Sequence, residues 1–163
     1  GLAEIVGGYG FIAVFVAAVV FRSYERSHAY QSVLHRFVEQ IERLLTLGVL
    51  LALGYASVHG LLDALTWQAV LVSVLLVAVI RPLASWASLT GVVDDPPQRA
   101  AIAFFGVRGV GSLYYLAYAA GQSTFDQAEV LWATVAFTIL LSVVVHGISA
   151  GPAMDRVDRY RYR

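Results

Sequence analysis

The stretch Val130–Met154 reads VLWATVAFTILLSVVVHGISAGPAM and carries no charged residue over 25 positions. A membrane helix needs about 20 mostly apolar residues to cross about 30 Å of hydrocarbon. This stretch is longer than that minimum, so we interpret it as a membrane-spanning helix. It decides how the rest of the chain is interpreted.

Four further apolar runs have a similar length, and they cover residues 5–21, 44–62, 64–93 with Arg81 inside, and 100–125 with Arg108 inside. Only helices and closed barrels satisfy the backbone in lipid, and the sequence lacks the alternating segments of about ten residues that a barrel needs. It therefore predicts an all-α, polytopic membrane protein. The five predicted transmembrane helices cover about 3–22, 35–60, 64–92, 98–121 and 127–152.

The composition supports this prediction. Hydrophobic residues make up 59% of the 163 residues, charged residues make up 13%, and the mean hydropathy is +0.72. Soluble domains are about 45–50% apolar and about 25% charged. A disordered chain, a nucleic-acid-binding domain and an ordinary soluble enzyme are excluded, and the lipid bilayer is the expected partner. The absence of Cys excludes disulfides and thiolate chemistry.

The basic residues are all Arg, and they gather in alternate connections between the predicted helices. By the positive-inside rule, the Arg-rich connections and the tail 155–163 lie in the cytoplasm. We expect the N-terminus outside and the C-terminus inside, in the cell inner membrane. Nine Arg carry this signal: Arg22, Arg26, Arg36, Arg43, Arg99, Arg156, Arg159, Arg161 and Arg163.

Helical spacing of apolar residues continues through Tyr30–Arg43, where Glu39 stands four residues before Arg43. This segment predicts a helix along the cytoplasmic interface that then turns inward. The chain begins at Gly1 without Met. We expect 1–163 to be a single membrane domain that is part of a longer protein.

Two Arg residues fall inside apolar runs, Arg81 and Arg108. A charge at the centre of a membrane helix costs about 2.5 to 3.5 kcal/mol on insertion scales, so each is a candidate functional residue. At about 1.5 Å per residue, Arg108 lies about 12 Å from the cytoplasmic end of its run. No Asp or Glu stands in any of the five runs. The partners are then backbone carbonyls, another chain or a missing part of the protein, unless the side chains extend to the interface.

Three glycines flank Arg108: Gly106, Gly109 and Gly111. Each weakens a helix by about 1 kcal/mol relative to Ala. Broken membrane helices expose backbone N–H and C=O groups at mid-depth, where ions and substrates bind. The fourth helix is therefore predicted to be broken near Gly106–Gly111. Close packing of helices through small residues is the alternative.

Ser112 and His146 are the one pair that suggests nucleophilic catalysis, as in an intramembrane serine hydrolase. No Gly follows Ser112, however, and a small packing residue explains it better. His146 stands with Gly147 near the end of the last helix, where it either caps helix-end carbonyls or relays protons. A third possibility is a non-catalytic membrane subunit that docks Arg81 and Arg108 onto a partner's carboxylates.

The segment Gly106–Ser112 (GVRGVGS) resembles the glycine-arginine-glycine signature of the sodium/proton exchanger family, the monovalent cation:proton antiporters. Four other segments are similar to that family in the same order along the chain. They are Ala3-Glu4-Ile5, Phe37–Glu42, Arg81-Pro82, and Val145–Ser149 followed by Pro152.

The resemblance implies the C-terminal part of an inverted-repeat antiporter that exchanges sodium or potassium for protons. The resemblance also implies a transporter and not an enzyme, with no cofactor and no resident metal, and a homodimer is expected. Arg81 would pair with a carboxylate and Arg108 would lie where two broken helices cross, with Gly106, Gly109, Gly111 and Ser112 around it. Glu4 would stand at an outer helix end. The ion-binding Asp belongs to an N-terminal half that this sequence does not contain.

Overall fold

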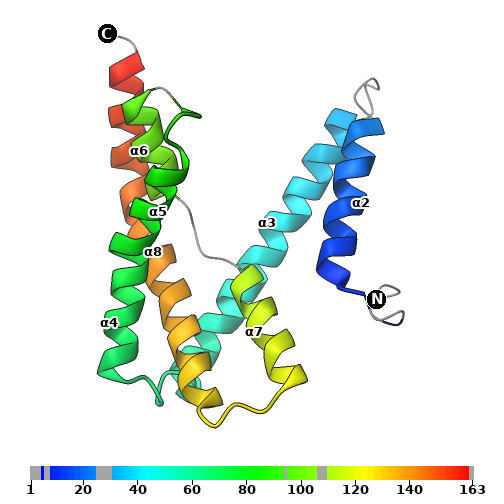
Figure 1. Ribbon diagram of the computed structural model, residues 1–163, viewed down its shortest axis with the longest axis vertical. Helices are drawn as coiled ribbons and strands as arrows, with labels where there is room; N and C mark the ends of the chain where they lie inside the picture. The colour runs from blue at the N-terminus through cyan, green and yellow to red at the C-terminus, as the bar shows by residue number, and fades with distance from the viewer. Residues whose placement is uncertain (1–4, 6–7, 25–30, 94, 106–109, 162–163) are drawn as a thin grey trace. The chain divides into compact units, whose positions relative to one another are not determined.

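The computed structural model describes residues 5, 8–24, 31–93, 95–105 and 110–161 (Figure 1). Every regular element in these residues is a helix, which confirms the all-α prediction. The chain divides into two compact units, Gly1–Leu45 and Thr46–Arg163.

The first unit holds α2 (Gly10–Tyr24) and the N-terminal part of α3 (Gln31–Ala56). The apolar part of α2, Ile12–Phe21, is shorter than a full membrane span. The predicted inward turn near Arg43 is wrong, because α3 continues through this position as one helix. The sequence offers no Gly or Pro there to end it.

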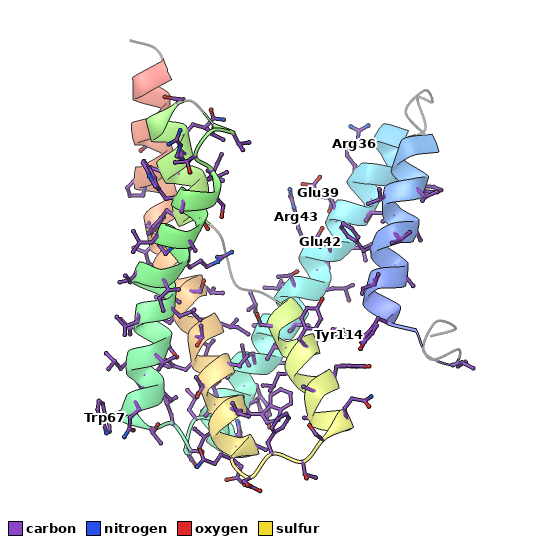
Figure 2. The ribbon with its side chains drawn as sticks, viewed as in Figure 1. Arg36, Glu39, Glu42, Arg43, Trp67 and Tyr114 are labelled. Atoms are coloured by element: carbon purple, nitrogen blue, oxygen red, sulfur yellow. The ribbon has the colours of Figure 1, made fainter. Side chains whose placement is uncertain are left out.

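The exposed start of α3 carries the predicted ion pair. Glu39 and Arg43 approach to 2.6 Å one helical turn apart, and both side chains are exposed (Figure 2). An exposed pair at this spacing contributes about 0.3–0.5 kcal/mol. It supports the helix and marks its polar end.

Three helices of the described chain are long and apolar enough to cross a membrane: Arg36–Leu61, Trp67–Ser88 and Ala128–Ala153. Their outward side chains are apolar, so lipid or other protein surface must cover them. Trp67 stands at the start of the second, where its side chain is 71% exposed (Figure 2). Trp is enriched at membrane–water interfaces, which suits this position.

The turn between the first two of these helices is set by its sequence. The π-helical segment η1 (Ser57–Leu61) follows α3, and Gly60 within it adopts a positive φ of 101°. Asp63 N–H then donates to Gly60 O at 3.1 Å. Thr66 begins α4 (Trp67–Leu75) by accepting the Ala69 N–H on its hydroxyl at 3.3 Å. A helix stop and an N-cap thus lie within seven residues.

The third predicted helix, 64–92, appears as α4, a π-helical segment η2 (Leu76–Ile80) and α5 (Arg81–Ser88) in direct succession. The turn after α5 contains Gly91 at a φ of 84°. Pro96 and Pro97 occupy the first turn of α6 (Pro96–Phe104), where the missing N–H costs nothing. The chain therefore re-enters a helix two residues before the predicted position.

The fourth predicted helix, 98–121, appears as two helices: α6 ends at Phe104 and α7 (Val110–Gln122) begins six residues later. Phe105 has non-helical backbone angles, with ψ at 16°. The predicted break at Gly106–Gly111 lies mostly in 106–109, outside the described residues.

The last helix, α8 (Ala128–Arg161), is longer than the predicted 127–152 and includes most of the predicted tail 155–163. Pro152 lies inside it. The predicted helix end at 152 is therefore earlier than the end of α8, and the cytoplasmic location of the tail stays a prediction.

The second unit is organised around α8, which packs against α4, η1, η2, α6 and α7. Small side chains permit this close approach, since Ala133 and Ala136 on α8 are fully buried and Ala69 on α4 is nearly so. Leu53 of α3 and Ile139 of α8 form a buried cluster with Ala136. Figure 1 shows the turn after η1 and the turn after α7 at one end of this unit, and the α5–α6 turn near the C-terminal end of α8.

Candidate functional site

The backbone just before Arg81 is widened. Arg81 N–H donates to Leu76 O, five residues back, rather than to the α-helical partner Val77 O. Pro82 explains this, because it has no N–H and its ring would clash with the carbonyl of Ala78 in a regular helix. The extra residue in the turn rotates Arg81 about the helix axis. Such π turns occur frequently at functional sites.

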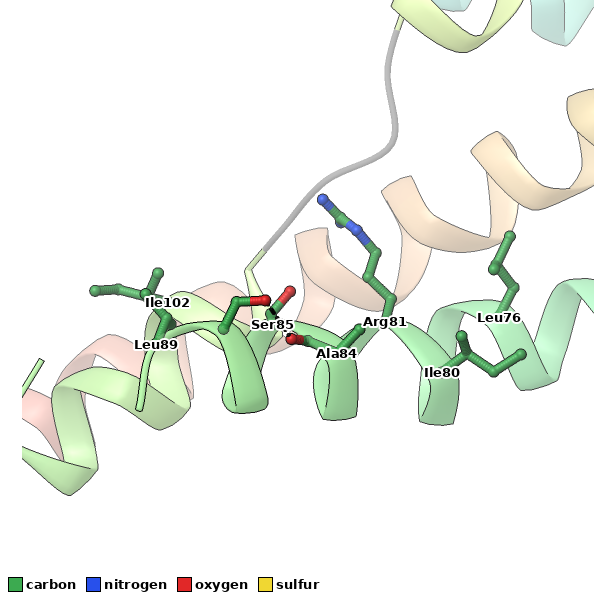
Figure 3. A pocket seen from close by; sticks show the side chains of 8 residues that line it. Leu76, Ile80, Arg81, Ala84, Ser85, Leu89 and Ile102 are labelled. Atoms are coloured by element: carbon green, nitrogen blue, oxygen red, sulfur yellow. Dashed lines mark hydrogen bonds between the residues drawn. The ribbon is translucent and has the colours of Figure 1, made fainter. Parts of the chain in front are cut away.

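Arg81 borders an open groove of about 480 Å³ between the η2–α5 stretch and α6. Figure 3 shows its side chain extended from the helix, with Leu76 and Ile80 on one side and Ser85 on the other. Arg81 is half-buried. The groove thus combines one cation, Arg81, with the hydroxyls of Ser85 and Ser88. The rest of its lining is apolar and consists of Leu76, Ile80, Ala84, Leu89 and Ile102.

His146 lies at the C-terminal end of α6. It is 6% exposed, and its Nε2 lies 2.8 Å from Phe104 O, the last carbonyl of that helix. The ring is also close to Phe104, with centroids 5.0 Å apart. The ring therefore lies at the end of α6 rather than at the end of its own helix, and its carbonyl-capping role stays a prediction.

Ser142 holds the other edge of the His146 ring. Nδ1 lies 2.6 Å from Ser142 O and 3.2 Å from Ser142 Oγ. Both ring nitrogens therefore face Ser142 or Phe104, and neither bonds to Ser112. The arrangement needed for a Ser112–His146 hydrolase is not formed in the described residues.

A second buried polar contact joins α4 and α8. Thr138 Oγ1 donates to Ser73 Oγ at 2.8 Å, and Ser73 Oγ donates to Ala69 O at 2.8 Å. Ser73 is fully buried and Thr138 is 8% exposed. Sequence analysis missed Ser73, although a lone Ser inside the long apolar run 64–80 was a signal for it.

Arg99, assigned only to topology by the sequence, has a structural role. Its Nε donates to Val93 O at 2.9 Å, and Nη2 donates to the same oxygen. Its guanidinium also lies over the Trp86 ring, 5.5 Å from the centroid. Arg99 thus ties α6 to α5 across the turn, a cation–π contact that spacing alone does not reveal.

The remaining predicted site residues fall into two groups. Gly111 and Ser112 lie in the first turn of α7, where a Cβ at Gly111 would meet no atom of the described chain within 4 Å. The others lie outside the described residues: Glu4, Gly106, Gly109 and Arg108. Within the described part of the chain, no three His, Asp or Glu side chains are grouped to hold a metal ion.

A family model described as "Sodium/hydrogen exchanger, transmembrane" matches residues 1–156. The chain belongs to this family. The resemblance drawn from the sequence is therefore confirmed, and the exchanger is a multi-pass membrane protein that takes part in cation/proton exchange. No curated protein and no solved structure matches the chain.

Members of this family are transporters and not enzymes. For this exchanger the assignment agrees with the geometry at His146, whose nitrogens are directed to α6 and Ser142. The hydrolase hypothesis is rejected on both grounds.

Proposed function

We propose that this chain is the C-terminal half of the membrane domain of an exchanger that moves sodium or potassium against protons by alternating access. Five spans are proposed, with α2 as the first and α6 together with α7 as the fourth. Two half-helices in one span would place helix ends at mid-depth, where they supply partial charges to an ion.

The observation that carries the proposal is the position of the end of α6. It stops at Phe104, inside the apolar run 100–125, and α8 holds its last carbonyl through His146. The end of α6 thus lies in an apolar run that also contains Arg108, and a charged residue within a membrane span is a candidate for the transport site.

The ion-binding carboxylate is proposed to stand on another part of the exchanger, because the five apolar runs contain neither Asp nor Glu. Arg81 is proposed to pair with a carboxylate of the transport core, at the position and rotation that the π turn sets. Arg108 is proposed to neutralise carbonyl ends where the broken helices cross, with Gly106, Gly109, Gly111 and Ser112 around it.

Exchange in everted vesicles tests these roles. The full-length exchanger is expected to dequench a pH-sensitive dye when sodium or potassium is added, and Arg108→Ala and Arg81→Ala are each expected to abolish the signal. Arg43→Ala is the matched control, because Arg43 is exposed and its ion pair with Glu39 lies within α3. Normal exchange by Arg108→Ala would contradict the role proposed for it.

The exchanger is also proposed to be a homodimer in the plasma membrane, with the N-terminus of this segment outside. The second unit supports the orientation, since the α5–α6 turn lies by the C-terminal end of α8 (Figure 1), and Arg99 stands in the first part of α6. A fluorescent protein fused after Arg163 should fold and fluoresce if that end is cytoplasmic. Native mass spectrometry should give twice the mass of one chain.

A further inference from the structure

The C-terminal end of α6 presents backbone carbonyls that no residue of α6 can satisfy. The last four C=O groups of any helix lack intrahelical donors. At this end, Phe105 N–H donates to Ala101 O at 2.9 Å, and His146 Nε2 on α8 lies within hydrogen-bond distance of Phe104 O, at 2.8 Å. The connection spans 42 positions of sequence, so it joins two separate helices. In an apolar environment such a bond is costly to lose.

The His146 ring is fixed on several sides. Its Nδ1 edge lies against Ser142 of the same helix, and the Phe104 and Phe105 rings approach it with centroids 5.0 Å and 6.3 Å away. Since the side chain is nearly fully buried, water does not compete for its nitrogens. The ring therefore holds one orientation, with Nε2 directed at α6.

The hydroxyl and the carbonyl of Ser142 compete for Nδ1 of a neutral ring. When Ser142 Oγ–H donates to Nδ1, the proton stands on Nε2 and the bond to Phe104 O is made, while the Nδ1 lone pair faces Ser142 O at 2.6 Å. When the proton is on Nδ1, it goes to Ser142 O, and the Nε2 lone pair then faces Phe104 O. A hydrogen bond at one ring nitrogen sets the tautomer at the other.

We propose that His146 is a positioning residue: its Nε2–H fastens the C-terminal end of α6 to α8 and so sets where the chain leaves α6, four residues before Arg108. The inference rests on the proposed exchange function. It differs from proton relay, because the ring acts by donating one hydrogen bond and need not change protonation during transport.

Two substitutions at His146 separate the ring's two edges. A Gln amide nitrogen reaches about as far as Nε2 and can still donate to Phe104 O. An Asn amide nitrogen reaches only as far as Nδ1 and can bond Ser142 O within α8. His146→Gln is expected to keep exchange within about threefold of the parent, while His146→Asn and His146→Ala lose about tenfold, the effect of one buried hydrogen bond. Ser142→Ala is expected to fall between them.

A distance measurement tests the positioning without any transport. Gln98 on α6 and Ile148 on α8 are both exposed, and the sequence contains no native Cys. Nitroxide labels on Gln98→Cys and Ile148→Cys are expected to give a narrow distance distribution in the parent and in His146→Gln. The distribution should broaden in His146→Asn and His146→Ala.

His59→Gln is the matched control. His59 Nδ1 contacts the carbonyl of Tyr55 four residues back at 2.8 Å, as His146 contacts Ser142, but it is exposed and lies in η1. Its exchange rate and label distances should match those of the parent.

Two results would overturn the proposal. Equal exchange and equal distances in the Gln and Asn variants would show that the ring only fills space. A His146→Gln variant as inactive as His146→Ala, with a flattened pH profile and unchanged distances, would show that His146 transfers protons. If the parent itself fails to exchange cations, the proposed function fails, and the label distances still decide whether His146 holds α6.

Discussion

Replacing Thr138 by Val removes the hydroxyl that joins α8 to α4 while keeping the shape of the side chain. The hydroxyl has one proton and two acceptors nearby, Ser73 Oγ at 2.8 Å and Thr134 O at 2.7 Å. Ser73 donates its own proton to Ala69 O, so Thr138→Val leaves no hydrogen without an acceptor. The cost is then one hydrogen bond and not the larger penalty of a buried orphan donor.

The expected size follows from this geometry. Hydrogen bonds between membrane helices contribute about 0.6 kcal/mol on average and at most about 1.7 kcal/mol. Thr138→Val is therefore expected to lower the free energy of unfolding by about 0.6–1.7 kcal/mol. Ser73→Ala removes the acceptor, and the Thr138 proton then rests on Thr134 O. A double-mutant cycle between Thr138 and Ser73 should return a coupling energy in the same range.

Unfolding in mixed micelles of increasing SDS content measures these free energies on the full-length exchanger. Thr134→Val is the control, because Thr134 Oγ1 donates to Val130 O within its own helix at 2.6 Å. It should show no coupling to Ser73→Ala. A Thr138–Ser73 coupling below about 0.2 kcal/mol, beneath the range for such bonds, would refute the argument that this bond joins the two helices.

Three further substitutions test the local features of the fold, each by the same unfolding measurement. Gly60→Ala should destabilise by about 1–2 kcal/mol, because Gly60 has a φ of 101° and a Cβ there would lie 3.2 Å from Asp63 Oδ2; an unchanged stability would contradict the turn. Thr66→Ala should cost about 0.5–2 kcal/mol through loss of the N-cap of α4, whereas Thr66→Ser should restore most of it. Pro82→Ala should raise the free energy of unfolding by up to about 3 kcal/mol, since Pro is unfavourable inside a helix. It should also lower the exchange rate, because the π turn η2, which orients Arg81, would close to a regular α-helix. If Pro82→Ala exchanged cations at the parent's rate, transport would not depend on the π turn.

Much of the architecture was accessible from the sequence because hydrophobic length is a local property. Val130–Met154 is apolar throughout, and it forms the greater part of α8. The helix ends were less accessible. Pro152 and the charged residues after it suggested an end, yet α8 continues to Arg161, since Pro in a long helix can be accommodated by its surroundings.

The candidate site was predicted unevenly. The capping role of His146 could be anticipated from its place in the last span, but not its partner, because Phe104 lies 42 positions away and no periodicity links the two. Arg81 stood out as a charge in an apolar run. The π turn that orients it was missed, although Pro82 at the next position was its sequence signal.

The sequence by itself determined that this exchanger is a helical membrane protein, because the length of an apolar run is read directly from consecutive residues. It also determined that the apolar runs of this segment contain two Arg and no carboxylate. Only the tertiary structure decided which polar groups meet. Ser73 with Thr138, and His146 with the end of α6, come together because small side chains on α8 let neighbouring helices approach closely. Inside an apolar environment each buried polar group must then find its partner on whichever helix that packing brings near.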